Sequence, residues 1–539
     1  MRRGHGKRPR SEPNKAVAKS GAPPPLFRLL STSRSDGAST GSVSIGDLLS
    51  GDFQEALLCN YIVDMGLLVE AQPRLGSVPV VVVHGDKENS VAEQGLRMQC
   101  AHINPGIRLH RPQIPTYGTH HTKMMLLKFP TGIRVVVLTA NFVSTDVEDK
   151  SQGVWYQEFP LRKAETCDFE ESLVGYLEKV GGPAADFGRT LRQYDFGAAR
   201  VALVPSVPGT GKSQHKGADL HKYGHMRVRS LLSREKVLLK EGGHKVVFQF
   251  SSLASLTDSP NQWLAELLAS FMPGEGGGEG GGEGAGGGSA VARKESSAET
   301  EARLKEHLRL VWPSVGAVRT SAKGWESGGS ICCNTENMYG GRYQRPDMAR
   351  YRSNNPRAEL RPLLRKWEGN PAVSRDRDAP HIKTYVRYRE VEGSGENGQH
   401  QRVDGDEVAW FLLTSSNLSR SAWGFLDKKT SKQLTLKSYE MGVMFLPSLM
   451  GPNNPQPATS HAPAFTCTPG EAGLTQRLPL TLGAACDAGQ ALPLKLLPLP
   501  YTLPAPQFNF NKGDEGNRPW VWDQEHNTLD HEGRSWPLR

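Results

Sequence analysis

The chain has 539 residues and a formal net charge of +9, which suits a polyanionic partner without specifying one. Apolar residues make up 37% of it, enough for a large core, and no apolar run reaches the roughly 20 residues that a membrane span needs. The seven cysteines are odd in number and include no Cys-x-x-Cys pair, which argues against a disulfide framework or a zinc cage and favours reduced thiols in an intracellular compartment.

Residues 1–45 are predicted to form a disordered, basic N-terminal tail, because Pro, Ser, Arg and Gly occur there without periodicity. The cluster Lys7-Arg8-Pro9-Arg10 is typical of a nuclear address, so we expect the protein in the nucleus. The same segment is rich in Arg and Ser and poor in acidic residues, which leaves an organellar transit peptide as an alternative. A solvated tail without any address is the third interpretation.

The first predicted domain covers residues 46–205. Apolar side chains between Leu48 and Leu58 recur at helical spacing and predict a helix. Residues 78–83 form a β-branched run that predicts a buried strand. Two further strands are expected at 124–127 and 133–138, joined by a turn at Pro130-Thr131-Gly132.

The second predicted domain covers residues 206–539 and repeats the alternation of strands and helices, which implies α/β layers. Its predicted strands are 246–250, 382–386 and 408–413, and its predicted helices are 263–271 and 360–367. Flexible insertions are expected near 273–300, 390–406 and 450–475, and the first of them is almost pure Gly with Glu from Gly274 to Gly288.

A weak internal duplication relates the two predicted domains. Each contains a His-x-Lys triplet that runs into a strand, then a second strand ending in Asn, and then a Gln or Glu close to a Gly-Val pair. In chain order these residues are His121, Lys123, Asn141 and Gln152 in the first domain, and His381, Lys383, Asn417 and Glu440 in the second. Two related halves that each supply half of one site are the simplest account of this order.

The repeated triplet has a chemical meaning. Side chains at i and i+2 of a strand share a face, so His121 and Lys123 point the same way, whereas His120 points to the opposite face. Each half-site therefore pairs an imidazole with a fixed cation, and the following Asn adds amide donors. Two such halves facing each other suit a phosphodiester, whose negative charge must be held while phosphorus is attacked.

The paired His-x-Lys and Asn pattern resembles the phospholipase D superfamily. That superfamily usually has an Asp five residues after the Lys, where this chain has Lys128 and Tyr388. The missing Asp, together with longer local strings, resembles the eukaryotic tyrosyl-DNA phosphodiesterase branch over roughly residues 45–539. The strings include Gly118-Thr119-His120-His121-Thr122-Lys123-Met124-Met125, Pro380-His381-Ile382-Lys383-Thr384-Tyr385, Asn417-Leu418-Ser419, Ser438-Tyr439-Glu440 and Arg518-Pro519-Trp520-Val521-Trp522.

The resemblance implies an α/β fold of two α/β/α sandwich domains related by a pseudo-two-fold axis, with the active site at their interface. It implies His121 as a nucleophile that forms a phosphohistidine and His381 as the general acid and base. The charge on phosphate oxygens would be held by Lys123, Lys383, Asn141 and Asn417. Gln152 and Glu440 would orient the imidazoles, although the sequence leaves open which ring each one serves. No metal or other cofactor is implied.

The same resemblance suggests where DNA is contacted. Tyr117 would stack on a base, with core packing as its alternative role. Further contacts would come from Ser252, Ser255 and Ser419. Arg420 would contact a phosphate, with a solvated surface position as the alternative.

We therefore expect a DNA repair phosphodiesterase of single-strand breaks. It would act as a monomer on 3′ ends of single- and double-stranded DNA, removing a topoisomerase-derived tyrosine, a peptide or another 3′ blocking group and leaving a 3′-phosphate. No membrane partner is expected. Two rivals stay open, a phospholipase D that acts on lipid headgroups and a DNA-end-binding protein without catalysis.

Overall fold

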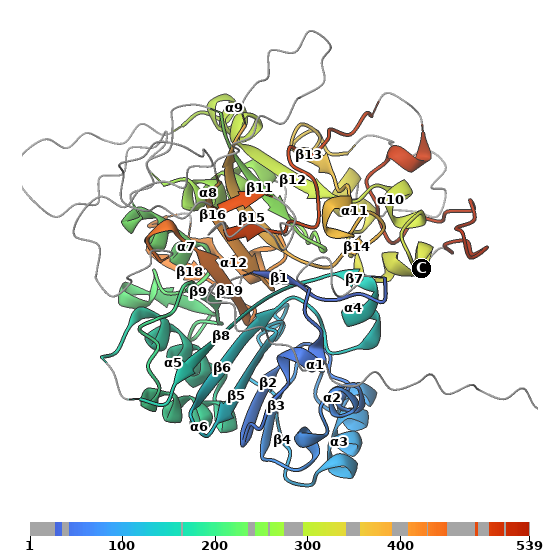
Figure 1. The fold of residues 1–539 in the computed structure, drawn as a ribbon. Helices are drawn as coiled ribbons and strands as arrows, with labels where there is room; N and C mark the ends of the chain where they lie inside the picture. The colour runs from blue at the N-terminus through green and yellow to red at the C-terminus, as the bar shows by residue number, and fades with distance from the viewer. Residues whose placement is uncertain are drawn as a thin grey trace, which may run out of the picture.

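The computed structural model describes residues 27–34, 42–162, 165–235, 243–256, 259–273, 295–340, 356–390, 408–427, 429–449, 480–482, 495–510 and 514–537. Figure 1 shows two halves, one below in blue to teal and one above in green to red. Almost all of the predicted insertions near 273–300, 390–406 and 450–475 lie outside the described residues.

The first half is built on a seven-stranded mixed sheet. Strands β2 and β3 pair parallel, as do β3 and β4, and the remaining neighbours pair antiparallel. In spatial order the strands are β1 (Arg28–Leu29), β8 (Gly153–Pro160), β6 (Gly132–Leu138), β5 (Met124–Phe129), β2 (Glu55–Cys59), β3 (Val80–Val83) and β4 (Arg108–His110). The predicted strands near 78–83, 124–127 and 133–138 and the turn between the last two are confirmed.

The second half repeats this sheet. Strands β11, β12 and β13 pair parallel, and the remaining neighbours pair antiparallel. In spatial order the strands are β9 (Ala202–Ser206), β19 (Glu440–Phe445), β16 (Val408–Thr414), β15 (Thr384–Arg389), β11 (His244–Gln249), β12 (Leu308–Trp312) and β13 (Leu364–Lys366). Position for position, the order and the strand directions match those of the first sheet.

This matching order confirms the duplication that the sequence suggested. The strands that follow the two His-x-Lys triplets, β5 and β15, occupy the same central place in their sheets. The strands that lead to the two Asn residues, β6 and β16, lie beside them, and β8 and β19 come next. The fold is thus the predicted pair of α/β/α layers related by a pseudo-two-fold axis.

Alternation of side chains along the strands divides the core into three clusters. Leu57 and Leu126 face a central cluster that also contains Phe411 and Leu413 of the other sheet, so the two sheets share one core. Neighbouring residues such as Leu58 point to the opposite face, against α1 to α3. The outer face of the second sheet packs on α7, α8 and further helices. Burial on both faces explains why the strands are apolar almost throughout.

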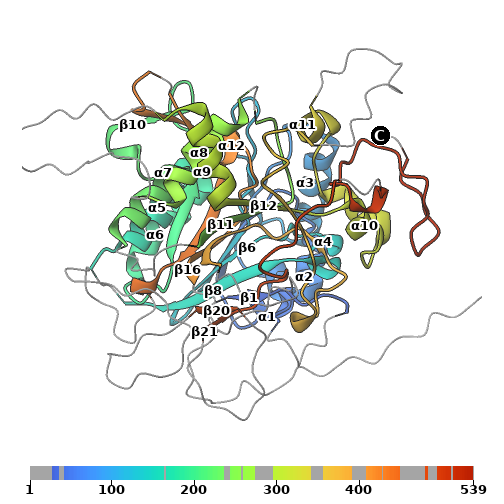
Figure 2. The same ribbon diagram turned by 90° about the horizontal axis from the view of Figure 1, so that it is seen from above.

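The helices cover the outer faces and fill the space beside the shared core. Figure 2 shows α5 to α8 gathered on one side of the strands, with α3, α4 and α10 on the other. The bounds are α1 (Ile45–Leu48), α2 (Met65–Ala71), α3 (Val91–Ile103), α4 (Ser144–Asp149), α5 (Asp168–Val180), α6 (Gly182–Thr190), α7 (Gly224–Arg234), α8 (Pro260–Phe271), α9 (Ser297–His307), α10 (Val315–Arg319), α11 (Thr335–Tyr339) and α12 (Arg420–Trp423).

Smaller sheets complete the described fold. Strands β7 (Lys150–Ser151) and β14 (Ala379–Pro380) pair parallel and join the two halves. The others are β10 (Gln214–Lys216) with β18 (Gln433–Thr435) and β17 (Phe425–Leu426), and β20 (Leu480–Leu482) with β21 (Lys495–Leu497). The halves approach closely at Gly153, where a Cβ would lie 2.6 Å from Leu413 and 2.8 Å from Ile382.

Two predicted helices are wrong. Residues 48–58 contain only the end of α1, and residues 56–58 belong to β2, a central strand buried on both faces. A strand of this kind carries an unbroken apolar run, which a short window cannot distinguish from a helix. Residues 360–367 form a turn that leads into β13, and Pro362, which has no backbone N–H, interrupts any helix there.

The domain boundaries also differ from the prediction at both ends of the first half. Part of the segment assigned to a disordered tail is ordered, because β1 pairs with β8 and Phe27 packs edge-on against Phe411, with ring centroids 5.0 Å apart. Strand β9 begins at Ala202 and pairs with β19, so the second half starts before residue 206. In each half, an edge strand therefore precedes the other six strands of the large sheet.

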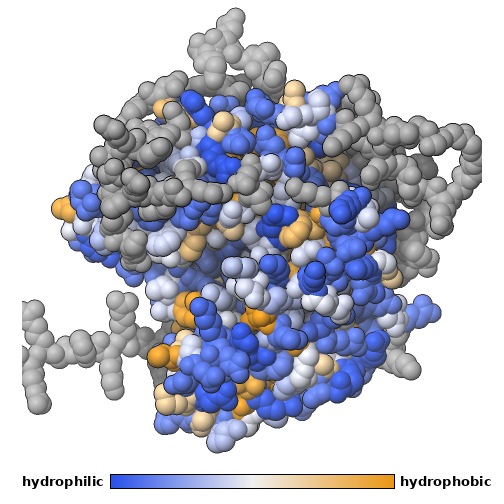
Figure 3. Space-filling view, turned by 180° about the vertical axis from the view of Figure 1, so that it is seen from behind, coloured by the Kyte–Doolittle hydropathy of each residue, from blue (hydrophilic) through white to orange (hydrophobic). Residues whose placement is uncertain are grey.

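The outer surface is mainly polar, because most apolar side chains of the described residues are buried in the core. Figure 3 shows a mainly hydrophilic face with scattered apolar groups. Among the described residues, no helix is both long and apolar enough to cross a bilayer.

We predict that the buried Arg375 anchors the N-terminal segment to the second half. Its Nη2 donates to the Leu30 carbonyl over 2.7 Å, and its Nε lies 3.3 Å from the Asp378 carboxylate, with both side chains fully buried. Removing one partner of a buried ion pair costs about 3–5 kcal/mol when the other charge stays uncompensated. Because Asp378 also pairs with Arg34, we expect the lower end of that range, about 3 kcal/mol, for the loss of Arg375. Arg375→Leu should therefore lower the free energy of unfolding by about that amount in urea titrations.

The control is Arg189→Leu, which removes the cation of an exposed pair with Asp186 and should cost about 1 kcal/mol or less. The double variant Arg375→Leu, Asp378→Leu should regain part of the loss. An Arg375→Leu protein as stable as the Arg189→Leu control would contradict the anchoring role.

Candidate active site

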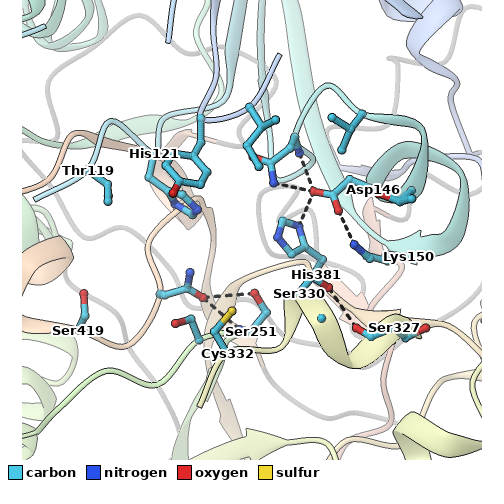
Figure 4. A pocket seen from close by; sticks show the side chains of 18 of the residues that line it. Thr119, His121, Asp146, Lys150, Ser251, Ser327, Ser330, Cys332, His381 and Ser419 are labelled. Atoms are coloured by element: carbon cyan, nitrogen blue, oxygen red, sulfur yellow. Dashed lines mark hydrogen bonds and ion pairs between the residues drawn. The ribbon is translucent and has the colours of Figure 1, made fainter. Parts of the chain in front are cut away.

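A cavity of about 640 Å³ lies where the two halves meet. Both sheets contribute to it, and Figure 4 shows His121 and His381 entering it from different segments. Side chains that line it include Tyr61, Tyr117, Thr119, His121, Asn141, Asp146, Lys150, Ser251, Ser252, Lys323, Cys332, His381, Asn417, Ser419 and Glu440. The structure thus brings both predicted imidazoles and both predicted carboxamides to one place.

Each His-x-Lys segment is held by the backbone of the opposite half. The amide of His121 donates to the carbonyl of Tyr439 over 2.8 Å. The amides of His381 and Ile382 donate to the carbonyl of Ser151 over 3.2 and 2.8 Å. The residues that follow Tyr439 and Ser151 are Glu440 and Gln152, so each imidazole lies beside the polar side chain of the other half.

The Nδ1 atom of His121 faces two acceptors. Glu440 Oε2 and the Ser415 carbonyl oxygen each lie 3.0 Å away. Neither can donate when Glu440 is ionised, so Nδ1 must carry the proton in the neutral ring. The lone pair is then on Nε2, the tautomer that a nucleophilic imidazole requires.

The Nδ1 atom of His381 lies beside a different set of polar groups. Gln152 Nε2 lies 2.9 Å away, and Asp146 Oδ2 lies 3.4 Å away. The hydroxyl of Thr139 donates to Gln152 Oε1 over 2.7 Å, and this oxygen also lies 3.3 Å from Nδ1. This nitrogen therefore has both a donor and an acceptor within reach.

The sequence left open which imidazole each of Glu440 and Gln152 contacts, and the structure answers this. Glu440 contacts His121, and Gln152 contacts His381, each across the boundary between halves. Each is also held by a hydroxyl, Ser415 for Glu440 and Thr139 for Gln152. Sequence analysis missed these hydroxyls, although both stand two residues before the Asn of their half.

The two predicted lysines are fully buried and are not among the side chains that line the cavity. Lys123 Nζ donates to the His121 carbonyl over 2.9 Å, and Lys383 Nζ donates in the same way to the His381 carbonyl. Burial, opposed by the carboxylates of Glu440 and Asp146, lowers the pKa of Lys123 to about 7. Burial and the charge of Lys123 hold the pKa of Lys383 well below its usual value.

Both imidazoles favour the neutral form. Burial and the charge of Lys123 lower the pKa of His121, against the opposing pull of Glu440. Burial lowers the pKa of His381 well below its usual range, while Asp146 opposes the shift. Burial alone would raise the pKa of Glu440, but His121 reverses this and the carboxyl ionises readily.

The two asparagines are held differently. Asn141 donates from its Nδ2 to Asp146 Oδ2 over 2.8 Å, whereas Asn417 Oδ1 accepts from the Ser251 amide over 3.1 Å. An amide nitrogen carries two hydrogens, so each Asn keeps at least one donor for a bound anion.

Asp146 and Lys150 are site residues that the sequence did not reveal. Asp146 Oδ1 lies 2.5 Å from Lys150 Nζ, and both side chains are buried. Five residues after Asn417, the position equivalent to Asp146 is Ala422. The duplicated pattern gives no signal for a residue that is present in one half alone.

The neighbouring His120 has the orientation that was predicted. It is fully buried away from the cavity, with Nδ1 3.2 Å from the Asn60 carbonyl and Nε2 3.4 Å from the Tyr176 hydroxyl. Burial lowers its pKa to about 3, so it stays neutral and structural.

The predicted DNA contacts fall into two groups. Tyr117, Ser252 and Ser419 line the cavity, and Tyr117 is 83% exposed, which excludes its alternative role in core packing. Ser255 is not part of the cavity lining, where Ala254 takes its place. Arg420 lies outside the lining as well, with its guanidinium 3.7 Å from the centre of the Phe425 ring.

The balance of charge at the base of the site favours an anion. When all are ionised, the ammonium groups of Lys123, Lys150 and Lys383 outnumber the carboxylates of Asp146 and Glu440 by one. A monoanion such as a phosphodiester would neutralise this excess in a region of low dielectric constant. Within the described residues, no three His, Cys, Asp or Glu side chains are grouped as metal ligands would be.

Known proteins resemble the chain over most of its length. A family model described as "Tyrosyl-DNA phosphodiesterase" matches residues 26–509. Tyrosyl-DNA phosphodiesterase 1 of Arabidopsis thaliana is 32% identical, over 95% of this chain and 77% of the plant protein. Tyrosyl-DNA phosphodiesterase 1 of Drosophila melanogaster is 27% identical, over 75% of this chain and 63% of the fly protein.

A solved structure shares the fold. The crystal structure of the yeast tyrosyl-DNA phosphodiesterase superposes with a TM-score of 0.60, covering 92% of this chain and 99% of the yeast chain. The sequence identity is 15%, so this likeness concerns the arrangement of the backbone.

We predict that anion binding in the cavity is coupled to proton uptake by Lys123. A bound anion favours the charged ammonium group and raises a pKa that is about 7 without it. Sulfate keeps its charge across this range, so its affinity should fall from about pH 6 to about pH 9, by up to roughly tenfold per unit. Isothermal titration calorimetry in buffers of different ionisation enthalpy measures both the affinity and the protons taken up.

Lys123→Met should remove most of this pH dependence. Lys216→Met, at an exposed position on β10, should keep it. A wild-type sulfate affinity that does not change over this pH range would show that Lys123 is not coupled to the anion.

Proposed function

The chain belongs to the tyrosyl-DNA phosphodiesterase family, and we propose that its cavity hydrolyses the 3′-phosphotyrosyl bond that joins DNA to a topoisomerase-derived tyrosine or peptide. The proposal rests above all on one observation. Two imidazoles in different hydrogen-bonding environments line one cavity, and a fully buried lysine stands two residues after each of them. Other 3′ blocking groups are included, and the process served is DNA repair.

The first step transfers the DNA phosphoryl group to His121. Its Nε2 lone pair attacks phosphorus, a P–N bond forms, and the bond from phosphorus to the tyrosine oxygen breaks. His381 gives its proton to the departing phenolate, whose conjugate acid has a pKa of about 10, so proton transfer assists the departure. As His121 becomes positive, the Glu440 carboxylate 3.0 Å from its Nδ1 stabilises the charge.

The second step returns His121 to its initial state. Neutral His381 accepts a proton from water, the oxygen of that water attacks phosphorus, and the P–N bond breaks. The products are free His121 and DNA with a 3′-phosphate. Since His381 acts as acid in one step and base in the next, it needs an environment that accepts both protonation states.

Charge on the phosphate oxygens is held by this chain's own side chains. Lys123 and Lys383 supply positive charge, and Asn141 and Asn417 supply amide donors, where many phosphotransfer enzymes use metal ions. We accordingly propose a reaction that needs no metal or other cofactor. Support comes from the chemistry of these four residues.

We propose that DNA 3′ ends, single- or double-stranded, approach along the side of the cavity that carries Tyr117, Ser252 and Ser419. Tyr117 is exposed and offers a face for base stacking, with Lys437 Nζ 5.1 Å from its ring centre. The partner would be a covalent adduct between a topoisomerase and DNA, and the enzyme would act as a monomer.

The two rival functions are not favoured. A family relationship that covers most of the chain points to tyrosyl-DNA phosphodiesterases rather than to phospholipases that act on lipid headgroups. It also points to an enzyme rather than to a DNA-end-binding protein without catalysis.

We expect the protein to release tyrosine from a 3′-phosphotyrosyl oligonucleotide at full rate in the presence of EDTA. His121→Ala should reduce turnover by about 10⁴-fold or more, since removal of a nucleophile abolishes the covalent route. His381→Ala should slow turnover by roughly 10²–10⁴-fold and accumulate a covalent enzyme–DNA complex, because the base for the second step is lost. Denaturing gels resolve tyrosyl DNA, phosphorylated DNA and the covalent complex.

His120→Ala is the matched control, because its ring lies outside the cavity, and any loss should track protein stability. Loss of wild-type turnover in EDTA would refute the metal-free proposal. A fully active His121→Ala enzyme would refute the assignment of the nucleophile.

We also propose a nuclear location, which the basic cluster Lys7-Arg8-Pro9-Arg10 supports. Fusion of the full chain to a fluorescent protein should give nuclear signal. Replacing the three basic residues of the cluster with Ala should move that signal out of the nucleus. Signal in an organelle would favour a transit peptide in its place.

A further inference from the structure

Asp146 occupies the centre of a small polar network on the first half. Its Oδ2 accepts from the Asn141 amide and carboxamide over 3.0 and 2.8 Å and lies 3.4 Å from His381 Nδ1. Its Oδ1 lies 2.5 Å from Lys150 Nζ. The residue is 2% exposed, so the carboxylate cannot exchange these partners for bulk water.

Gln152 adds no charge beside His381. Its amide nitrogen lies 2.9 Å from Nδ1 and its amide oxygen 3.3 Å, while Thr139 donates to that oxygen and the amide nitrogen also donates to the Asp146 carbonyl over 3.2 Å. When His381 is an imidazolium, Nδ1 carries a hydrogen and the ring a positive charge. Asp146 Oδ2 is the carboxylate oxygen within reach of that hydrogen.

We propose that Asp146 is a positioning residue for the general acid, because it accepts the hydrogen bond from Nδ1 of protonated His381 and so stabilises the ring in its acid form. When the ring gives up its Nε2 proton, the neutral form keeps its hydrogen on Nδ1, so Asp146 can accept that hydrogen in both the acid and the base form. The lone pair of the neutral ring is then on Nε2, the nitrogen that accepts a proton from water in the second step. This inference rests on the proposed function.

The asymmetry of the duplicated site supports the proposal. His121 has a carboxylate, Glu440, at hydrogen-bonding distance, whereas the corresponding side chain beside His381 is the neutral Gln152. Asp146 supplies the missing carboxylate from α4, and its counterpart in the second half is Ala422. A carboxylate is thus present beside each imidazole, but only His381 also has a donor on the same nitrogen.

The charged groups around His381 act in opposite directions. Asp146 faces it from α4 and favours the protonated ring, whereas Lys150 from β7, Lys383 beside it and Lys123 from the other half oppose protonation. Because burial also opposes protonation, Asp146 is the group that keeps the acid form accessible. Removing its charge should therefore lower the pKa of His381 further.

The test compares two leaving groups in single-turnover experiments with the full-length protein. A 3′-phosphotyrosyl oligonucleotide needs a proton for its departing phenolate, whereas the 3′-(4-nitrophenyl phosphate) of the same oligonucleotide releases a much weaker base. Asp146→Asn should slow tyrosine release by roughly 10- to 100-fold, the range for losing a hydrogen bond to a charged group. Nitrophenol release should change by less than about threefold, since acid catalysis contributes little there.

The pH profile gives a second readout that a merely structural role would not shift. In Asp146→Asn, the alkaline limb of the tyrosine-release profile should move to lower pH. Lys150→Met should move it to higher pH, because a cation that opposes protonation of His381 is lost. Glu148→Gln, an exposed change of the same charge on the same helix, is the matched control and should leave both rates unchanged.

Equal slowing of both substrates by Asp146→Asn, or an alkaline limb that does not move, would overturn the proposal. If Asp146→Asn does not fold, Lys150→Met serves as the test. An alkaline limb that stays in place or moves to lower pH in Lys150→Met would then overturn the proposal. Failure of the wild type to cleave either substrate would instead refute the proposed function, so the two failures are distinguishable.

Discussion

The structure depends on a reciprocal contact between its two halves. Glu440 of the second half holds His121 of the first, and Gln152 of the first half holds His381 of the second. The same exchange occurs in the backbone, where each His-x-Lys segment is hydrogen-bonded to the opposite half. Neither imidazole is fixed until the halves have met, so the site exists only in the assembled fold.

Burial makes the site sensitive to every charge within it. Lys123 and Lys383 have no exposed surface, and their pKa values fall because an ammonium ion is costly to desolvate. Asp146 and Glu440 offset part of this cost, and an anionic substrate would offset the rest. The site thus has an excess of positive charge that favours an anion, together with neutral imidazoles, as the proposed reaction requires.

Sequence patterns predicted the fold well wherever they were long or repeated. The hairpin of β5 and β6 followed from two apolar runs around a Pro-Thr-Gly turn, and α8 followed from its apolar stripe. The helix predicted at 48–58 failed because a strand buried on both faces shows no alternation. Strand β1 was missed because two residues in a Pro- and Ser-rich context carry no pattern, and pairing with β8 is what orders them.

For the proposed active site, the sequence by itself determined which polar groups come together, because the order of His, Lys, Asn and Gln or Glu occurs twice and duplicated halves place duplicated residues together. Tertiary structure alone decided which imidazole each polar side chain serves, since that contact crosses between segments more than 200 residues apart, as Gln152 and His381 show with a separation of 229. It also decided the proposed role of Asp146, which has no counterpart in the second half. Only the folded structure brings the Asp146 carboxylate close to the ring of His381, which the other half contributes.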